Sequence, residues 1–179
     1  MAGPTADFNL IASTTGVGRT YRYAQHIPPG LVKLHFGSGL SYATFFYSGA
    51  SAALASPASV SVSVQLARAS GMAGARQVTQ VYVGVPPLPG TVTPRLALQA
   101  YTVSVPQAQA GLLTFSLPYP GAFYTTLLDG SRQVTGGNYT IWVGGHQPGD
   151  DRGERCSNVL QVALALPASA VLPCPLPPP

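Results

Sequence analysis

The most constraining feature of the chain is the stretch SVSVSVQLA, residues 59–67, in which polar and apolar residues alternate without interruption. Successive side chains of an extended strand point to opposite faces of the sheet. Val60, Val62, Val64 and Leu66 therefore share one face, and the polar residues share the other. This period of two predicts a strand with one buried face and one solvent-exposed face.

Five later segments are enriched in β-branched and aromatic residues and predict further strands. Turn-forming residues are dense between them, and the segments are 77–85, 96–105, 112–117, 138–145 and 157–166. Asp129-Gly130 signals a hairpin, because Gly tolerates the positive φ that such a turn requires. No segment has a helical apolar stripe longer than about three turns. The sequence thus predicts an all-β fold, an antiparallel immunoglobulin-like β-sandwich.

The length of 179 residues suits one domain of ordinary size with tails. We assign residues 42–166 to the sandwich. Residues 1–41 lack clean alternation and are expected to form an extended lead-in. Residues 167–179 are a proline-rich tail, for which we expect no more than a local polyproline tendency.

Charged residues make up 8% of the chain, against roughly 25% in average soluble domains. Its nine Lys and Arg residues are scattered singly, so no basic stripe points to nucleic acid. The first ten residues lack the basic and apolar segments of a secretory signal, and prolines interrupt the most apolar stretch, so we expect no membrane span. Cys156 and Cys174, the two cysteines, are compatible with a disulfide or with two free thiols.

The segment FGSGLSY, residues 36–42, places Gly37 and Gly39 two positions apart. A phosphate-binding loop needs such glycines between a strand and the N-terminus of a helix. Here the residues that follow, LSYATFFY, have the character of a strand, so we expect the glycines to make a tight turn instead. Their apolar neighbours are expected to pack inward, namely Phe36, Leu40 and Tyr42.

Two spaced motifs around this segment resemble a known family. GRTYRY, residues 18–23, followed by FGSGLSYATF, residues 36–45, is similar to a junction in family-3 glycoside hydrolases, the β-glucosidases and β-xylosidases. In that family the junction leads into a C-terminal fibronectin type III-like domain. Two later stretches, 59–86 and 127–145, resemble hairpins of that domain.

The resemblance covers residues 18–166 and departs from the family at His35, where a proline is usual, and at residues 95–101. It implies a non-catalytic accessory domain whose partners, in cis or in trans, are glycosidase catalytic domains. It also implies an extracellular parent enzyme acting on β-linked glucose or xylose saccharides, with GNYTIWVGGHQPG looking more like the xylosidase branch. The linker motif would pack through Arg19, Tyr21, Tyr23, Phe36, Gly37, Gly39 and Tyr42.

Carboxylates are too few and too dispersed to predict catalysis by this chain. A retaining glycosidase needs two carboxyl groups about 5 Å apart, and the five acids are Asp7, Asp129, Asp150, Asp151 and Glu154. A turn aspartate usually bonds its own backbone, and the spacing of the last three matches no EF-hand. The three histidines, His26, His35 and His146, lie far apart in sequence. We expect no catalytic residue, cofactor or metal site.

Aromatic residues support an alternative function, a stand-alone carbohydrate-binding or adhesion module. Planar side chains with a polar edge often serve recognition, and the candidates are Tyr119, Phe123, Tyr124, Tyr139 and Trp142. Strand alternation turns some of these rings toward the core, and we retain Tyr119, Tyr124 and Trp142 as candidates for stacking on a sugar of a polysaccharide. Asn138 begins a formal N-glycosylation sequon, NYT, within a predicted strand.

Overall fold

The structure of the protein, a computed structural model, describes residues 20–23, 35–89, 91, 93–127, 129–150 and 157–168. These residues form one helical turn, α1 (Thr20–Tyr23), and nine strands. The strands are β1 (Ala43–Ser56), β2 (Ser59–Gly71), β3 (Gln77–Gly84), β4 (Ala97–Ser104), β5 (Gly111–Pro118), β6 (Thr125–Thr126), β7 (Arg132–Gln133), β8 (Gly137–Gly144) and β9 (Val159–Leu166).

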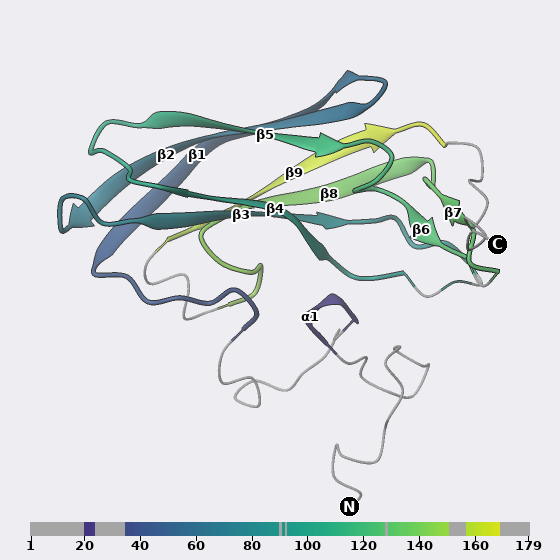
Figure 1. Ribbon diagram of the computed structural model, residues 1–179, viewed down its shortest axis with the longest axis horizontal. Coiled ribbons are helices and arrows are strands. Elements are labelled where there is room, and N and C mark those ends of the chain that lie inside the picture. The colour runs from purple at the N-terminus through teal and green to yellow at the C-terminus, as the bar shows by residue number, and fades with distance from the viewer. Residues whose placement is uncertain are drawn as a thin grey trace, which may run out of the picture.

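Seven of the strands form two facing sheets, one with the order β1-β2-β5 and the other with the order β4-β3-β8-β9. All the pairings within them are antiparallel. The short strands β6 and β7 pair separately. Figure 1 shows the sheets as two layers. The prediction of an all-β antiparallel sandwich is therefore confirmed.

The core lies between the sheets, and alternation in the sequence decides which side chains enter it. Val60, Val62 and Val64 of β2 are fully buried, and the serines between them lie on the other face. Strand β8 follows the same rule, since Tyr139, Ile141 and Val143 are buried. Other buried side chains of the same core are Phe45, Tyr47, Val81, Phe115, Leu117 and Phe123.

Asn158, just before β9, ties the edge strand β1 to the opposite sheet. Its Oδ1 accepts a hydrogen bond from Tyr47 N at 2.7 Å, and its Nδ2 donates to Tyr47 O at 2.9 Å. The ring of Tyr47 reaches into the core, where its hydroxyl lies 2.9 Å from Thr79 Oγ1 on β3. One asparagine thus satisfies both backbone groups of an edge residue, which are costly to leave unpaired when they are removed from water.

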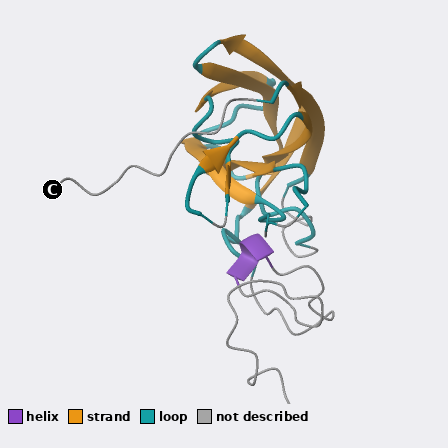
Figure 2. Cartoon of the chain, turned by 90° about the vertical axis from the view of Figure 1, so that its right-hand side faces the viewer, coloured by secondary structure: helices purple, strands orange, loops and turns teal. Residues whose placement is uncertain are grey.

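Most strand positions agree with the sequence predictions, with two differences. Strand β1 begins at Ala43 and runs to Ser56, well beyond the apolar run LSYATFFY. The lead-in is also not extended throughout, because Thr20–Tyr23 form a helical turn, which Figure 2 shows outside the layered strands.

The predicted hairpin at Asp129-Gly130 is present between β6 and β7, with Gly130 at φ 82°. Cys156, Cys174 and residues 169–179 lie outside the described residues.

Candidate functional site

The two linker motifs meet on the outer face of the sheet β4-β3-β8-β9, the face turned away from the core. The rings of Tyr21 and Phe36 stack with centroids 4.0 Å apart and planes 4° from parallel. Tyr21 also meets Tyr82 of β3 edge-on at 6.2 Å. We call residues 20–23 and 35–41 the clasp. Figure 1 shows both parts of it on the side of this sheet that faces away from β1, β2 and β5.

Two outward-facing side chains of β3 hold the clasp. Gln80 Nε2 donates to Gly37 O at 2.8 Å, and the Tyr82 hydroxyl donates to Gln80 Oε1 at 2.6 Å. Both side chains are buried beneath the clasp, and burial raises the pKa of Tyr82 above its usual value. The helical turn adds two bonds at the start of β4, from Arg95 N to Arg22 O at 2.7 Å and from Leu98 N to the Tyr21 hydroxyl at 3.3 Å.

Position 37 of the clasp requires a glycine. Its φ is +73°, and a Cβ built on it would lie 2.5 Å from Gln80 Oε1. Side chains disfavour this left-handed conformation, and the extra atom would displace the amide that holds the segment. Gly39 has neither restriction, since no atom lies within 4 Å of its ideal Cβ. The expected tight turn therefore rests on Gly37.

The loop that leaves β8 supports the other side of the clasp. Ser38 Oγ donates a hydrogen bond to Asp150, which is buried. His146 is buried as well, and its Nδ1 and Nε2 lie 2.9 Å from Gln147 O and 3.0 Å from Ser157 O. Its two ring nitrogens are thus engaged by the backbone on either side of the loop, which indicates a structural role for this histidine.

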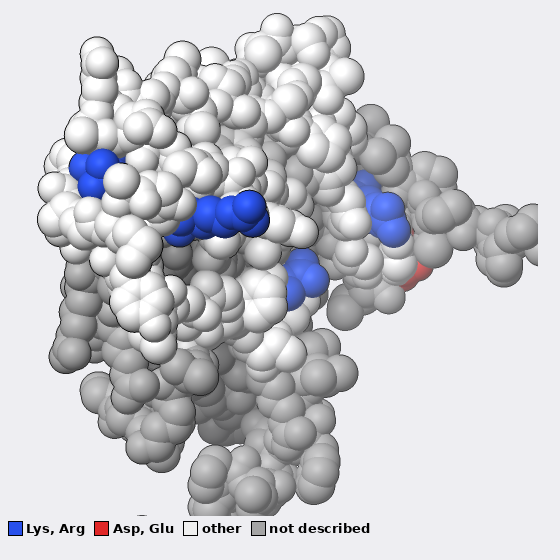
Figure 3. Space-filling view, turned by 60° about the vertical axis from the view of Figure 1, so that its left-hand side comes forward, with Lys and Arg blue, Asp and Glu red and all other residues white. Residues whose placement is uncertain are grey.

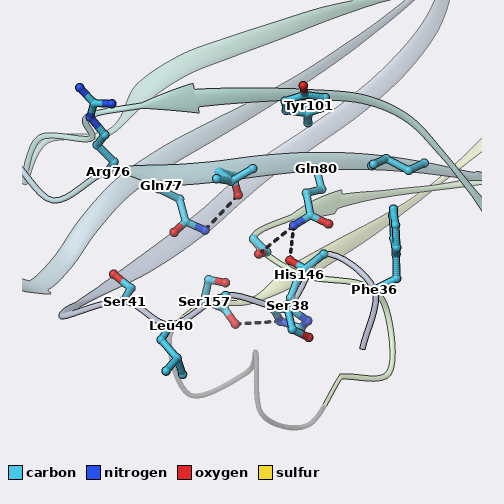
Figure 4. Close-up of a pocket in the computed structure, with 15 residues that line it drawn as sticks. Phe36, Ser38, Leu40, Ser41, Arg76, Gln77, Gln80, Tyr101, His146 and Ser157 are labelled. Atoms are coloured by element: carbon cyan, nitrogen blue, oxygen red, sulfur yellow. Dashed lines mark hydrogen bonds between the residues drawn. The ribbon is translucent and has the colours of Figure 1, made fainter. Parts of the chain in front are cut away.

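A cavity of about 390 Å³ opens between the clasp and the sheet. Its lining combines apolar groups with polar ones, and Figure 4 shows Tyr101 and Gln80 on the strand side and Ser38 and Ser41 on the clasp side. Arg76 lies at one end of the cavity, and Leu40 points away from the sheet. A volume of this order is enough to hold a small group or a partner's side chain.

Only some of the predicted linker residues that the structure describes make contacts in the clasp. Tyr21, Phe36 and Gly37 take part in the clasp as given above, whereas the half-buried Tyr23 makes no bond recorded among the described residues. The expectation that Leu40 and Tyr42 pack inward is wrong for this chain, because both side chains are almost fully exposed. Phe36 meets it only in part, since its ring stacks on Tyr21 but remains 47% exposed. Arg19 lies outside the described residues.

Sequence reasoning missed Gln80 and Tyr82, the two side chains that anchor the clasp. Both belong to a strand that was predicted, and both alternate with the core residues Val81 and Val83. The available signal was Tyr82 itself, a tyrosine on the face of the strand expected to be polar. A large aromatic ring at such a position indicates that another segment packs over it.

The aromatic candidates for sugar stacking do not form one platform. Phe123 and Tyr139 are fully buried in the core and present no free ring face. Tyr119 packs against Phe123 at 6.1 Å, and Arg132 covers the ring of Tyr124 at 4.7 Å. Trp142 is half-buried on the outer face, where its Nε1 donates to Gln161 Oε1 at 3.2 Å. Stacking of a sugar on Tyr119, Tyr124 or Trp142 stays a prediction.

The two described carboxylates, Asp129 and Asp150, each have hydrogen-bond partners of their own. Asp129 accepts bonds from Ser131 Oγ and Ser131 N, and these bonds lower its pKa. Asp150 accepts from Ser38 and sits under the clasp. No group of three His, Cys, Asp or Glu side chains able to hold a metal occurs within the described ranges. Asp151 and Glu154 lie outside them.

The surface of the described part of the chain is sparsely charged and basic. It carries five arginines, Arg22, Arg68, Arg76, Arg95 and Arg132, against two aspartates, of which Asp150 is buried. Figure 3 shows separate Lys and Arg groups on a largely uncharged face. Across the ranges that the structure describes, we find no helix with the length and apolar character needed to cross a membrane.

Comparison with known proteins finds similar sequences within β-glucosidases. The chain is similar to "Probable beta-glucosidase D" of Aspergillus oryzae, with 32% identity over 156 aligned residues, covering 74% of this chain and 20% of that enzyme. The corresponding enzyme of Aspergillus flavus is 31% identical with the same coverage. This chain therefore spans about a fifth of the length of these relatives. No family model matches it.

Solved structures show the same fold. The β-glucosidase 3B of Thermotoga neapolitana superposes with a TM-score of 0.63 at 22% identity, covering 79% of this chain and 18% of that one. The GH3 β-glucosidase of Bifidobacterium adolescentis gives a TM-score of 0.60 at 23% identity, with coverages of 74% and 18%.

The class that fold and motifs define is thus a β-sandwich of the kind found within glycoside hydrolases. More closely, the chain is homologous to family-3 β-glucosidases. What it shares with them is consistent with their C-terminal, fibronectin type III-like domain, as the motifs predicted.

Proposed function

We propose that this chain is a non-catalytic accessory domain of a family-3 β-glucosidase, and that it supports the catalytic domains by packing against them. The observation that carries the proposal is the combination of a homologous sandwich with a match to only 20% of the relatives' length. The rest of such an enzyme has to supply the active site.

The chemistry of the described residues supports this division of labour. Retaining hydrolysis requires two carboxyl groups about 5 Å apart with room for a sugar between them. Asp129 is held by Ser131 in a hairpin turn, and Asp150 is buried under the clasp and bonded to Ser38. Both are placed to hold backbone segments in position rather than to face a substrate.

The substrate class follows from the relatives rather than from a site on this chain. The similar enzymes carry the name β-glucosidase, so we propose β-linked glucosides as the substrates of the parent enzyme. The preference for the xylosidase branch that GNYTIWVGGHQPG suggested finds no support in these comparisons.

The proposal is tested by transplanting the chain. In the Aspergillus oryzae β-glucosidase D, the region that aligns with this chain is replaced by residues 18–168, and a second variant lacks that region altogether. Hydrolysis of an aryl β-glucoside and the temperature of half-inactivation are measured for both. A supporting domain gives a chimaera that is more active and more heat-resistant than the deletion variant. A chimaera that behaves like the deletion variant contradicts the proposal.

A further inference from the structure

We infer that the catalytic portion of the parent enzyme docks on one defined surface of this chain, made by Leu40, Val78, Tyr101 and Val103 with Arg76 at its edge. This docking surface combines Leu40 of the clasp with neighbouring residues on the outer face of the sheet β4-β3-β8-β9. The inference rests on the proposed function and adds to it the surface and the chemistry of its partner.

Sheet register brings the strand residues of the docking surface together. Val78 of β3 pairs with Val103 of β4, and Gln80 pairs with Tyr101. Side chains at directly paired positions lie on the same face, and the neighbouring Thr79 and Val81 point into the core. Leu40, Val78, Tyr101 and Arg76 line the same cavity, so clasp and strands form one continuous surface.

The apolar side chains of the docking surface are exposed together on one side of the molecule. The exposed fractions are 102% for Leu40, 68% for Tyr101, 52% for Val103 and 41% for Val78. Scattered single apolar residues on a surface are normal, whereas a contiguous group beside a cavity marks an interaction site. The cavity under the clasp offers the kind of recess in which an apolar anchor of a partner can be buried.

The positive charge at the edge of the docking surface indicates which charges its partner should carry. Arg76 is exposed at the end of the cavity, and no ion pair to it is recorded among the described residues. Because the only exposed carboxylate described is Asp129, in the hairpin between β6 and β7, the surface favours a partner with an apolar centre and carboxylates at its rim. The relatives carry some four-fifths of their length outside the matched region, which provides a partner of the size that an interface requires.

Hydroxyl-radical footprinting of the isolated 179-residue chain and of the chimaera described above locates the interface. The docking surface is confirmed if oxidation of Leu40 and Tyr101 falls severalfold in the chimaera. Phe46 and Leu112, exposed on the opposite sheet at 56% and 68%, serve as controls and should keep their reactivity. If the chimaera is stabilised but Leu40 and Tyr101 stay as reactive as in the isolated chain, the surface is wrong and the proposed function stands. A chimaera no more stable than the deletion variant overturns both.

A matched pair of variants gives the energetic test. The chimaera is expected to have a higher half-inactivation temperature than the deletion variant. Tyr101→Glu in the chimaera should remove most of this gain, whereas Leu112→Glu, at an equally exposed position, should leave it unchanged. Arg76→Glu should lower the gain as well. Equal urea midpoints of the three variants and the wild type as isolated chains exclude a general folding defect. Equal losses for Tyr101→Glu and Leu112→Glu in the chimaera overturn the inference.

The same footprinting distinguishes a sugar site from a protein interface. Cello-oligosaccharide or xylo-oligosaccharide added to the isolated chain should leave the oxidation of Tyr101 unchanged. Protection of Tyr101 by either sugar would assign the cavity to saccharide and overturn the docking inference.

Discussion

The rings of Tyr21 and Phe36 stack face to face, 4.0 Å apart, although fifteen positions separate them in the chain. They come from two different motifs, GRTYRY and FGSGLSY, and Tyr21 also meets the ring of Tyr82 on β3, one of the two inner strands of the sheet. Neither motif, in the residues that the structure describes, contributes to the core of the sandwich. Together they cover part of the outer face of the sheet, where Gln80 and Tyr82 would otherwise be exposed.

The stack should contribute a measurable coupling energy. Tyr21→Ala and Phe36→Ala each open the clasp, and a double-mutant cycle should give a coupling of about 0.5–1.5 kcal/mol for the aromatic pair. The reporter is hydrogen exchange of the Arg95 amide, which donates to Arg22 O and is exposed when the helical turn detaches. Additive effects, within about 0.3–0.5 kcal/mol, would show that the rings do not act as a pair.

The two glycines of FGSGLSY should respond differently to the same substitution. Gly37→Ala places a Cβ 2.5 Å from Gln80 Oε1 at φ +73°, and the backbone strain alone is about 1–2 kcal/mol. Gly39→Ala is the matched control, because nothing lies within 4 Å of its Cβ, and it should change stability by less than about 0.5 kcal/mol. Exchange of the Arg95 amide again gives the opening free energy. Equal effects at both positions would contradict this account of the turn.

Asn158 should be one of the most sensitive polar residues of the sandwich. Asn158→Ala leaves the N–H and C=O of Tyr47 without their side-chain partner and should lower the free energy of unfolding by about 1–3 kcal/mol. Asn158→Asp should lower it at neutral pH too, because a carboxylate oxygen then faces Tyr47 O. Urea unfolding followed by the fluorescence of Trp142, the single tryptophan, measures both. Asn138→Ala, at an exposed strand position, is the control and should have little effect.

Buried tyrosines predict a loss of stability in alkali. Burial raises the pKa of Tyr139 to about 12, and burial also raises the pKa of Tyr47. The unfolded chain releases these protons near pH 10 while the folded chain retains them, so stability is full below pH 10 and falls as pH rises toward 12. Each such tyrosine adds at most about 1.4 kcal/mol per pH unit to the slope.

Urea midpoints measured from pH 8 to 12 check this slope. Tyr139→Phe removes the hydroxyl that lies 2.8 Å from Thr135 O and 3.1 Å from Phe123 O. It should cost about 1 kcal/mol at neutral pH and make the decline above pH 10 shallower. An unchanged slope would show that Tyr139 is not responsible.

The sequence was informative wherever local alternation decides which side chain is buried. Strands such as β2 and β8 and the turn at Gly130 could be predicted because a period of two and a glycine with positive φ leave direct marks in the residues. The clasp could be predicted only as a linker, since its contact with Gln80 joins residues 43 positions apart. Leu40 and Tyr42 were expected to be inside because they are apolar, and no local pattern distinguishes an apolar residue of the core from an exposed one.

The central claim is that this sandwich supports an enzyme whose active site lies elsewhere. Its most direct test is the temperature of half-inactivation of the Aspergillus oryzae β-glucosidase D in three forms: intact, lacking the matched region, and carrying residues 18–168 of this chain in its place. The account predicts that the transplanted chain restores much of the heat resistance lost on deletion, while the isolated chain releases no product from an aryl β-glucoside. A chimaera that inactivates at the same temperature as the deletion form, or an isolated chain that hydrolyses the glucoside, would contradict it.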